Sequence, residues 1–218
     1  MYALAIVPAR GNSKGIPRKN LALCAGRPLV VWTIQAVNKS RRINSAVLSS
    51  DDAEIRERAT GKVAPWSRPV ELAQDETSTE AVLADVLDVP GTWKPDIVVL
   101  LQPTSPLRRA EHIDEAIELL ERTGADSVVS VSPTHAHLWD ADGRPQYAQR
   151  RRRQDMAPQY EENGSIYAFT MDHWRRTGNR LGGHVELYVM GEEHRYQVDT
   201  PTDLAICELL LERSAVLA

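Results

Sequence analysis

The sequence predicts an α/β protein in which helices cover both faces of a mostly parallel sheet. Short apolar runs rich in β-branched residues alternate along the chain with longer stretches whose apolar side chains have helical spacing. The clearest strand is DIVVLL at residues 96–101, in which five apolar residues follow one another. A strand that is apolar throughout is buried on both faces, which is typical of the central strands of a parallel sheet. The alternation of strands with helices indicates the same architecture.

Strands are expected where a compact apolar run is bounded by a proline, a glycine or a polar turn. The first run, YALAIVP, ends at Pro8, and the last, VELYVM, follows a glycine-rich turn. In chain order, the strands are expected at residues 2–8, 45–50, 96–101, 126–132, 164–170 and 185–190.

Helices are expected where helical apolar spacing is accompanied by capping residues. Thr77 and Glu80 have the spacing of a capping box, as do Thr200 and Asp203. Gly124 can close the amphipathic stretch that precedes it. In chain order, the helices are expected at residues 27–40, 53–59, 77–87, 110–124 and 200–213.

The alternation stops between about residues 133 and 165. This stretch is polar, contains Pro133, Pro145 and Pro158, and carries four successive arginines at 150–153. It is too short to bury a core of its own. We therefore expect a single domain over residues 1–218, with an excursion from the sheet at about 133–165.

The composition excludes several classes of protein. A formal net charge of −4 provides no overall positive field that would attract nucleic acid or an acidic membrane. Cys24 and Cys207 lie far apart, which is neither a disulfide framework nor a metal cluster and fits a reducing cytoplasm. No run approaches the ~18 consecutive apolar residues of a membrane span. We expect a cytoplasmic protein that binds neither nucleic acids nor membranes.

A basic loop, ARGNSKGIPRKN at residues 9–20, directly follows the first expected strand. Such a loop lies at the carboxyl end of a parallel strand, where open α/β sheets bind their ligands. Arg10, Lys14 and Lys19 supply positive charge of a density that matches a polyphosphate. The loop contains neither GxxxxGK[ST] nor GxGxxG, and the simpler alternative is a solvated surface loop. Its position directly after a buried strand favours the binding site.

The small residues of the loop suit anion binding by the backbone. Gly11, Asn12 and Ser13 can turn their N–H groups inward as a nest. Gly15 is expected to leave room where a ligand approaches.

Seven sequence blocks, in order, resemble the acylneuraminate cytidylyltransferases, the enzymes known as CMP-sialic acid synthetases, and their relatives. They span nearly the whole chain and are ARGNSKGIPRKN (9–20), RPVELA (68–73), LLQPTSPLR (100–108), RRQD (152–155), ENGSIYAF (162–169), LYVM (187–190) and VDTPTDL (198–204). The resemblance implies a Rossmann-like sheet and a homodimer in which the excursion reaches toward the partner's active site. It also implies CTP as donor, magnesium or another divalent cation as cofactor, and an acidic acceptor whose oxygen attacks the α-phosphate to release pyrophosphate.

The resemblance also assigns roles to individual positions. The residues implied for catalysis and triphosphate binding are Arg10, Lys14 and Lys19. Asn20 and Arg68 are implied for nucleotide binding in addition. The nest residues Gly11, Asn12 and Ser13, together with Ser78, are also expected to bind the nucleotide. Those implied for acceptor binding are Gln102, Arg153 and Tyr167, and Asp199 is implied for the metal. Simpler interpretations exist for two of them: Gln102 could satisfy backbone groups at a strand end, and Asp199 could complement a helix dipole.

Two departures from the family pattern concern the metal and the acceptor. Gln197 stands where the family commonly has a second acidic residue, so a metal on Asp199 would depend more on triphosphate oxygens and water. Arg180, flanked by Asn179 and Leu181, stands where aromatic residues can pack on the sugar.

The acceptor is therefore left with more than one candidate. An arginine in place of aromatic side chains suits a smaller or more anionic acceptor, whose acid group Arg180 would bind together with Arg153. The default acceptor is a 2-keto-3-deoxy sugar acid such as a sialic acid-like nonulosonic acid, and the alternative is a small phosphonate. A non-catalytic nucleotide-binding protein is a remoter alternative, because such a protein would be expected to lose these charges.

Two clusters in the excursion have simpler interpretations than ligand binding. The arginines at 150–153 lack interleaved aromatic residues, which favours a solvated surface over an RNA-binding patch. His135 and His137 have no third His or Cys near them in the sequence, which favours packing or a pocket wall over a metal site.

Overall fold

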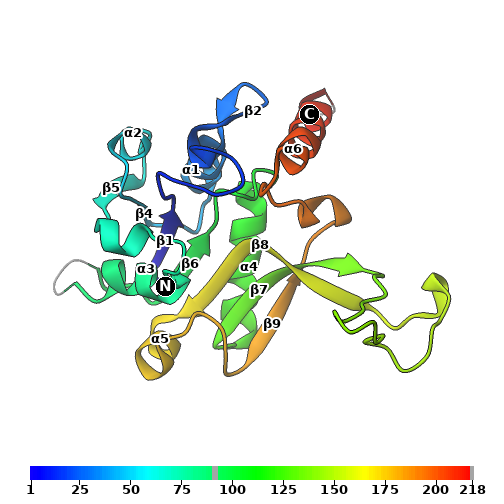
Figure 1. Ribbon diagram of the computed structural model, residues 1–218. Helices are drawn as coiled ribbons and strands as arrows, with labels where there is room; N and C mark the ends of the chain where they lie inside the picture. Colours follow the sequence, from blue (N-terminus) through cyan, green and yellow to red (C-terminus); the bar gives the residue numbers. More distant parts are fainter. Residues whose placement is uncertain (90–92, 217–218) are drawn as a thin grey trace.

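A seven-stranded sheet forms the centre of the computed structural model, which describes residues 1–89 and 93–216 (Figure 1). The strand order is β5-β4-β1-β6-β8-β7-β9, and all neighbours are parallel except β8, which runs antiparallel to β6 and β7. The strands are β1 (Ala3–Pro8), β4 (Ser45–Ser50), β5 (Val63–Ser67), β6 (Ile97–Leu101), β7 (Ser127–Thr134), β8 (Gln159–Thr170) and β9 (Val185–Val189). A small hairpin pairs β2 (Leu23–Cys24) with β3 (Arg27–Pro28). The predicted Rossmann-like, mostly parallel sheet is confirmed.

Helices cover both faces of the sheet, as predicted. They are α1 (Leu29–Lys39), α2 (Ala53–Arg56), α3 (Thr79–Leu87), α4 (Ala110–Thr123), α5 (Met171–Thr177) and α6 (Pro201–Val216). Alternate residues of β1 point to opposite faces: Ala5 and Val7 pack with α1 and α4, whereas Leu4 and Ile6 pack with α3 and α5. A third cluster, which includes Cys207, joins α6 to the hairpin. Within the described residues there are also four short 3-10 turns: η1 (Lys19–Leu21), η2 (Val70–Ala73), η3 (Arg153–Asp155) and η4 (Glu192–Arg195).

The predicted caps are confirmed at two helices and shifted at a third. Gly124 ends α4 with a left-handed φ of 64°. Asp203 accepts a hydrogen bond from the Thr200 N–H at 2.8 Å, and the Thr200 hydroxyl accepts one from the Asp203 N–H at 3.3 Å. At α3 the cap is Ser78 instead of Thr77, since the Ser78 hydroxyl accepts from the Ala81 N–H at 3.1 Å.

Besides the β2–β3 hairpin and the 3-10 turns, strand β5 and helix α5 were not expected from the sequence. Strand β5 contains Pro65 and Trp66 and lies at the edge of the sheet, where a proline costs no internal hydrogen bond. Helix α5 has seven residues between Thr170 and Gly178, too few for a helical period to be recognised.

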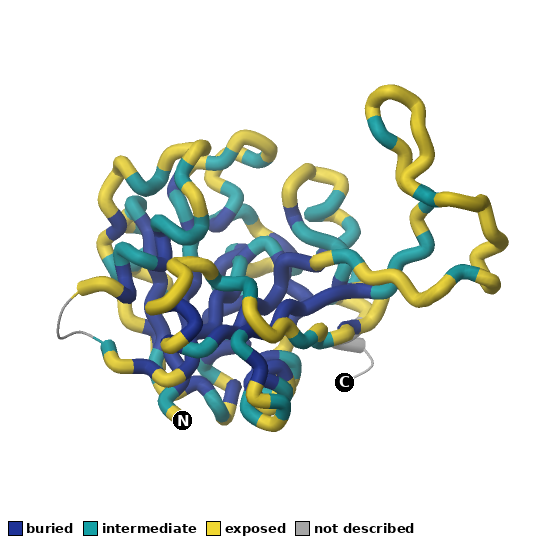
Figure 2. Tube along the Cα trace, turned by 90° about the horizontal axis from the view of Figure 1, so that it is seen from below, coloured by how far each residue is buried: buried dark blue, intermediate teal, exposed yellow. Residues whose placement is uncertain are grey.

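The excursion is shorter than predicted. Strand pairing between β7 and β8 continues outward to Thr134 opposite Gln159, so only residues 135–158 leave the sheet. We call these residues the arm; Figure 2 shows that the arm projects from the body of the molecule and is largely exposed. In the part of the chain that the structure describes, no helix is long and apolar enough to cross a membrane.

Candidate active site

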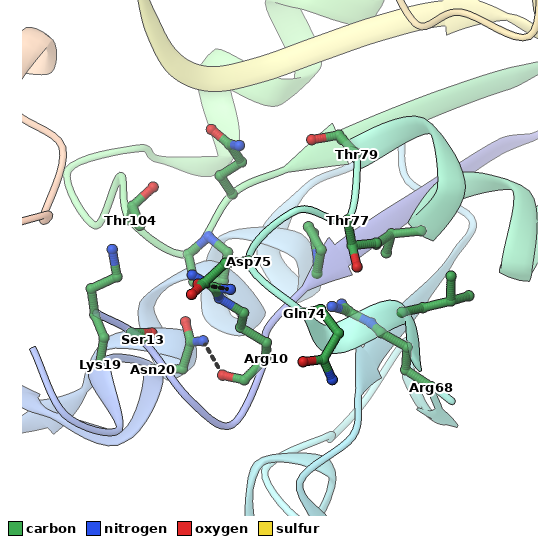
Figure 3. A pocket seen from close by; sticks show the side chains of 15 residues that line it. Arg10, Ser13, Lys19, Asn20, Arg68, Gln74, Asp75, Thr77, Thr79 and Thr104 are labelled. Atoms are coloured by element: carbon green, nitrogen blue, oxygen red, sulfur yellow. Dashed lines mark hydrogen bonds and ion pairs between the residues drawn. The ribbon is translucent and has the colours of Figure 1, made fainter. Parts of the chain in front are cut away.

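A pocket of about 310 Å³ opens at the carboxyl ends of β1 and β6, where successive strands change the side on which they join the sheet (Figure 3). Open α/β sheets bind ligands at such a switch point. The lining includes six of the residues predicted for the site, namely Arg10, Ser13, Lys19, Asn20, Arg68 and Gln102. Gly11, Asn12, Lys14 and Ser78 lie in the same segments but do not line this pocket.

The basic loop is held in place by a contact within the loop and by a contact from a distant part of the chain. The buried Asn20 donates from Nδ2 to the Arg10 carbonyl at 2.8 Å. The Gly11 N–H donates to Asp51 Oδ1 at 2.9 Å, so this N–H is occupied by a carboxylate and does not contribute to the predicted nest.

The far end of the loop packs on the segment before α6. A Cβ on Gly15 would lie 2.1 Å from the Asp199 carbonyl oxygen, so glycine is needed here because backbone, and not a ligand, approaches it. Lys19 Nζ lies 2.7 Å from Asp199 Oδ1, which brings the predicted triphosphate lysine and the predicted metal ligand together. The Asp199 side chain is 67% exposed and therefore remains open to a further ligand.

Arg68 provides a fixed positive charge on one wall of the pocket. Its side chain is buried and donates from Nε to Ser49 Oγ at 3.0 Å and from Nη2 to the Ser49 carbonyl at 2.6 Å. Burial lowers the pKa of Arg68 to about 10, which still leaves the guanidinium charged at neutral pH.

Sequence reasoning missed Asp75, which lines the pocket among the basic residues. Its carboxylate lies 2.6 Å from Arg10 Nη1 and 2.9 Å from Lys14 Nζ. Only Gln74 separates Asp75 from the RPVELA block, and this proximity to a family motif was the sequence signal that could have indicated a site residue.

Arg108, at the end of the LLQPTSPLR block, was also not assigned a role. It is buried and donates to the Gln102 carbonyl at 3.1 Å, the Ser165 carbonyl at 2.6 Å and the Thr33 hydroxyl at 2.5 Å. Burial lowers the pKa of Arg108 to about 9. The side chain thereby fixes the turn that presents Gln102 to the pocket.

The side chains of Gln102 and Gln197 meet over Gly164. A Cβ on Gly164, whose φ is 62°, would lie 2.8 Å from Gln102 Oε1 and 2.1 Å from Gln197 Oε1. Gln197 thus places its amide oxygen beside Gly164, on the same side as the amide oxygen of Gln102.

The structure brings together two of the predicted acceptor residues and leaves a third apart. The guanidinium of Arg180 lies 4.9 Å from the ring centroid of Tyr167 and forms an ion pair with Glu80. Burial raises the pKa of Tyr167 to about 12, and its hydroxyl donates to Glu162 at 2.9 Å. Arg153 lies on the arm, where its nearest acidic partner is Glu192 at 3.7 Å.

The two arginines therefore share no partner within the described chain. The reason is spatial: η3 carries Arg153 out on the arm, whereas Arg180 follows α5 beside the sheet. Their joint binding of one acid group of the acceptor stays a prediction.

The histidines of the arm form no metal site. His137 packs edge-on against Tyr147 with ring centroids 5.1 Å apart, and His135 lines a different hollow from His137. Over residues 1–89 and 93–216, no group of three or more His, Cys, Asp or Glu side chains is placed to hold a metal ion.

The open, mostly parallel sheet and the cationic pocket at its switch point define the class of protein, an α/β protein with a pocket suited to an anionic ligand. The chain belongs to the cytidylyltransferase family, which it matches over residues 4–218. The family predicted from the sequence blocks is thereby confirmed.

Curated relatives agree with this assignment. The chain is 34% identical to N-acylneuraminate cytidylyltransferase A of Danio rerio over 215 residues, covering 94% of this chain but 49% of the relative. It is also 34% identical to the CMP-N,N'-diacetyllegionaminic acid synthase of Legionella pneumophila over 229 residues, covering 97% of both chains. The chain thus spans about half the length of the first relative and nearly all of the second.

Solved structures confirm the fold. A CMP:2-keto-3-deoxy-manno-octonic acid synthetase complexed with CTP superimposes with a TM-score of 0.74 at 16% identity, covering 98% of this chain and 100% of that chain. A 4-diphosphocytidyl-2C-methyl-D-erythritol synthase from Anaerococcus prevotii gives a TM-score of 0.68 at 14% identity, covering 97% and 96%.

Proposed function

We propose that the protein transfers CMP from CTP to a hydroxyl group of an acidic sugar of the nonulosonic type and releases pyrophosphate. One observation carries the proposal: Arg10, Lys19 and Arg68 converge on a pocket at the switch point of a cytidylyltransferase sheet. The end-to-end match to a CMP-N,N'-diacetyllegionaminic acid synthase supports the nonulosonic class of acceptor.

The chemistry requires charge neutralisation more than a strong base. The acceptor oxygen forms a bond to the α-phosphorus, the bond from that phosphorus to the bridging oxygen breaks, and the hydroxyl proton passes to solvent. Negative charge accumulates on the phosphoryl oxygens and on the leaving pyrophosphate. Arg10, Lys14 and Lys19 are assigned to hold that charge, because they come from the basic loop, which borders the pocket.

The remaining nucleotide contacts are assigned to the pocket walls. Arg68 supplies a guanidinium whose position is fixed by Ser49. Asn20 acts by holding the Arg10 backbone. Ser78 acts by starting α3, whose first residue, Thr79, lines the pocket.

The donor set fits a magnesium ion that enters with the triphosphate. Magnesium keeps several waters and is commonly held by one or two carboxylates together with substrate phosphates. Asp199 offers an exposed carboxylate beside Lys19, with the neutral amide of Gln197 two residues earlier. When bound there, the ion would supply further neutralisation of phosphate charge.

The acceptor is assigned to the region between Gln102, which lines the pocket, and the pair of Tyr167 and Arg180, which lies outside the pocket lining. Glu80 balances the charge of Arg180, which reduces its capacity to attract a second anionic group. A doubly anionic phosphonate acceptor requires that charge to be free, so the structure offers no specific support for it.

We further propose that two copies of the chain associate through the arm and the adjacent sheet edge. Exposed apolar side chains gather there: Leu138, Trp139, Tyr160, Val185, Leu187 and Val189 are each 40–60% exposed. Such an association would bring Arg153 of one copy toward the acceptor of the other. Light scattering at micromolar concentration is expected to give twice the monomer mass, and a monomer would contradict this proposal.

The function is tested by measuring pyrophosphate release from CTP with a panel of acids. The panel contains N-acetylneuraminate, a diacetylated nonulosonic acid, 3-deoxy-octulosonic acid and a small phosphonate, each with magnesium. We expect release with CTP and a nonulosonic acid, and little with ATP, GTP or UTP. Release that ignores the nonulosonic acids would refute the acceptor class, and the absence of CTP turnover with every acid would refute the activity.

A further inference from the structure

Asp75 is an acidic side chain among the cations of a pocket to which we assign a triphosphate. One carboxylate oxygen, Oδ1, accepts from Arg10 Nη1 at 2.6 Å, and the other, Oδ2, lies 2.9 Å from Lys14 Nζ. Figure 3 shows Asp75 directly beside Arg10 in the pocket. A negative charge here must repel any polyphosphate that enters, so its presence needs an explanation.

Each predicted triphosphate cation has a carboxylate partner from the chain itself. Arg10 and Lys14 share Asp75, and Lys19 pairs with Asp199. Lys14, and then Arg10, lower the pKa of Asp75, so the carboxylate is ionised at neutral pH. The two carboxylates therefore occupy the hydrogen-bond donors that phosphate oxygens would use.

Asp75 lies where it can exchange partners. It belongs to the turn between η2 and α3, and its side chain is 34% exposed at the edge of the pocket. Rotation of this short side chain toward solvent requires no movement of the buried core. Phosphate oxygens form charge-assisted hydrogen bonds with Arg and Lys of the kind that a carboxylate forms, so the two anions compete for the same donors.

We propose that Asp75 is an exchangeable counter-ion of the triphosphate site, an inference that depends on the proposed function. Between turnovers, Asp75 holds Arg10 and Lys14 within reach of the pocket. The incoming triphosphate displaces Asp75, and the carboxylate returns to the two cations as pyrophosphate leaves. Asp75 thereby weakens product binding and accelerates product release.

A purely structural role predicts the opposite sign. If Asp75 served only to position Arg10 and Lys14, its removal would loosen both cations and weaken polyphosphate binding. If Asp75 competes with phosphate, Asp75→Asn keeps the shape of the side chain, removes the charge and strengthens binding. We expect the dissociation constant for pyrophosphate to fall about tenfold, a modest effect for a partly exposed charge at contact distance.

The chain offers a matched control at the next position. Glu76→Gln makes the same change in net charge, and Glu76 has no ion pair with Arg10 or Lys14 among the described residues. Calorimetric titration with inorganic pyrophosphate and magnesium is performed on the wild type, Asp75→Asn and Glu76→Gln. Steady-state kinetics then give kcat, the KM for CTP and the inhibition constant of pyrophosphate.

We expect Asp75→Asn to bind pyrophosphate more tightly, to show stronger product inhibition and to have a lower kcat. Glu76→Gln should behave like the wild type. Equal or weaker pyrophosphate binding by Asp75→Asn would overturn the inference. Equal tightening in both variants would also overturn it, since the cause would then be general charge. A wild type that binds neither pyrophosphate nor CTP would instead refute the proposed function itself.

Discussion

The nucleotide pocket and the arm differ in how far along the chain their contacts reach. The pocket is held by pairs such as Arg10 with Asp75 and Lys19 with Asp199, which are 65 and 180 residues apart. The arm is held mainly by local pairs, such as Arg152 with Asp155. Tertiary contacts within one chain therefore shape the pocket, whereas the arm retains exposed apolar residues such as Trp139. The difference supports the proposal that one chain binds the nucleotide while a second copy completes the acceptor side.

The largest effect is expected at the core of the pocket. Lys19→Ala should lower kcat/KM by ~10²-fold or more, the scale for an electrostatic contact that strengthens in the transition state. Thermal unfolding should change little. The exposed Lys94→Ala serves as control and should leave turnover unchanged. If Lys19→Ala kept wild-type turnover, the prediction would be wrong and the basic loop would have no catalytic role through Lys19.

Arg153→Ala tests whether the arm contributes to acceptor binding and not to CTP binding. Because this arginine lies on the arm, its loss should raise the acceptor KM about tenfold or more, as expected for a lost charged partner in a specificity site. CTP affinity, measured by titration, should stay within error of the wild type. Arg151→Ala removes a neighbouring exposed arginine of the arm as control. Equal effects of Arg153→Ala and Arg151→Ala, or a loss of CTP binding, would contradict the proposal that the arm serves the acceptor and the pocket serves the nucleotide.

The dependence of folding stability on pH tests whether His112, which is half-buried, stays neutral in the folded protein. Burial lowers the pKa of His112, at the start of α4, to about 3. In the unfolded chain His112 takes up a proton near its ordinary pKa of about 6.5. The unfolded state therefore binds more protons between these values, and folding stability should fall as the pH decreases from about 6.5 toward about 3.

His112→Gln should reduce this loss when the free energy of unfolding is measured in denaturant at several pH values. The exposed His184→Gln is the control and should follow the wild type. An unchanged slope in His112→Gln would mean that the histidine is not kept neutral in the folded protein.

The smallest effect is expected at Ser78, which caps α3. Ser78→Ala should cost about 1 kcal/mol of stability, the usual value for a lost N-cap, and Ser78→Asn should restore it. The dissociation constant for CTP should change little in Ser78→Ala. A rise of about tenfold in the CTP dissociation constant, equivalent to about 1.4 kcal/mol, would show instead that the hydroxyl contacts the nucleotide.

The sequence was sufficient where a single local pattern decides the structure. The apolar run before Pro8 specified β1 to within one residue, and Gly124 specified the end of α4. The orientation of β8 could not be predicted, because an apolar pattern shows burial but not the direction of a strand. Asp75 was missed because its meaning depends on Arg10 and Lys14, which reach it only through the fold.

The sequence-based interpretation was also incomplete at two residues whose type can serve more than one physical purpose. Gly15 was expected to admit a ligand, and it admits the backbone of Asp199. Arg180 was expected to face an acid group of the acceptor, and in the structure it pairs with Glu80 of the chain itself. In both cases the sequence indicated that something approaches the position, and only the structure identifies what it is.

The contact between Gly15 and Asp199 has a consequence for the order in which the protein is made. The ribosome synthesises the basic loop early and the segment that supports it late. A chain interrupted before residue 197 would contain every strand of the sheet but lack the backbone on which Gly15 packs and the carboxylate that holds Lys19. Such a fragment is expected to fold much of its sheet while the far end of the basic loop, at Gly15 and Lys19, lacks its support, so full ligand binding would be acquired only near the end of translation.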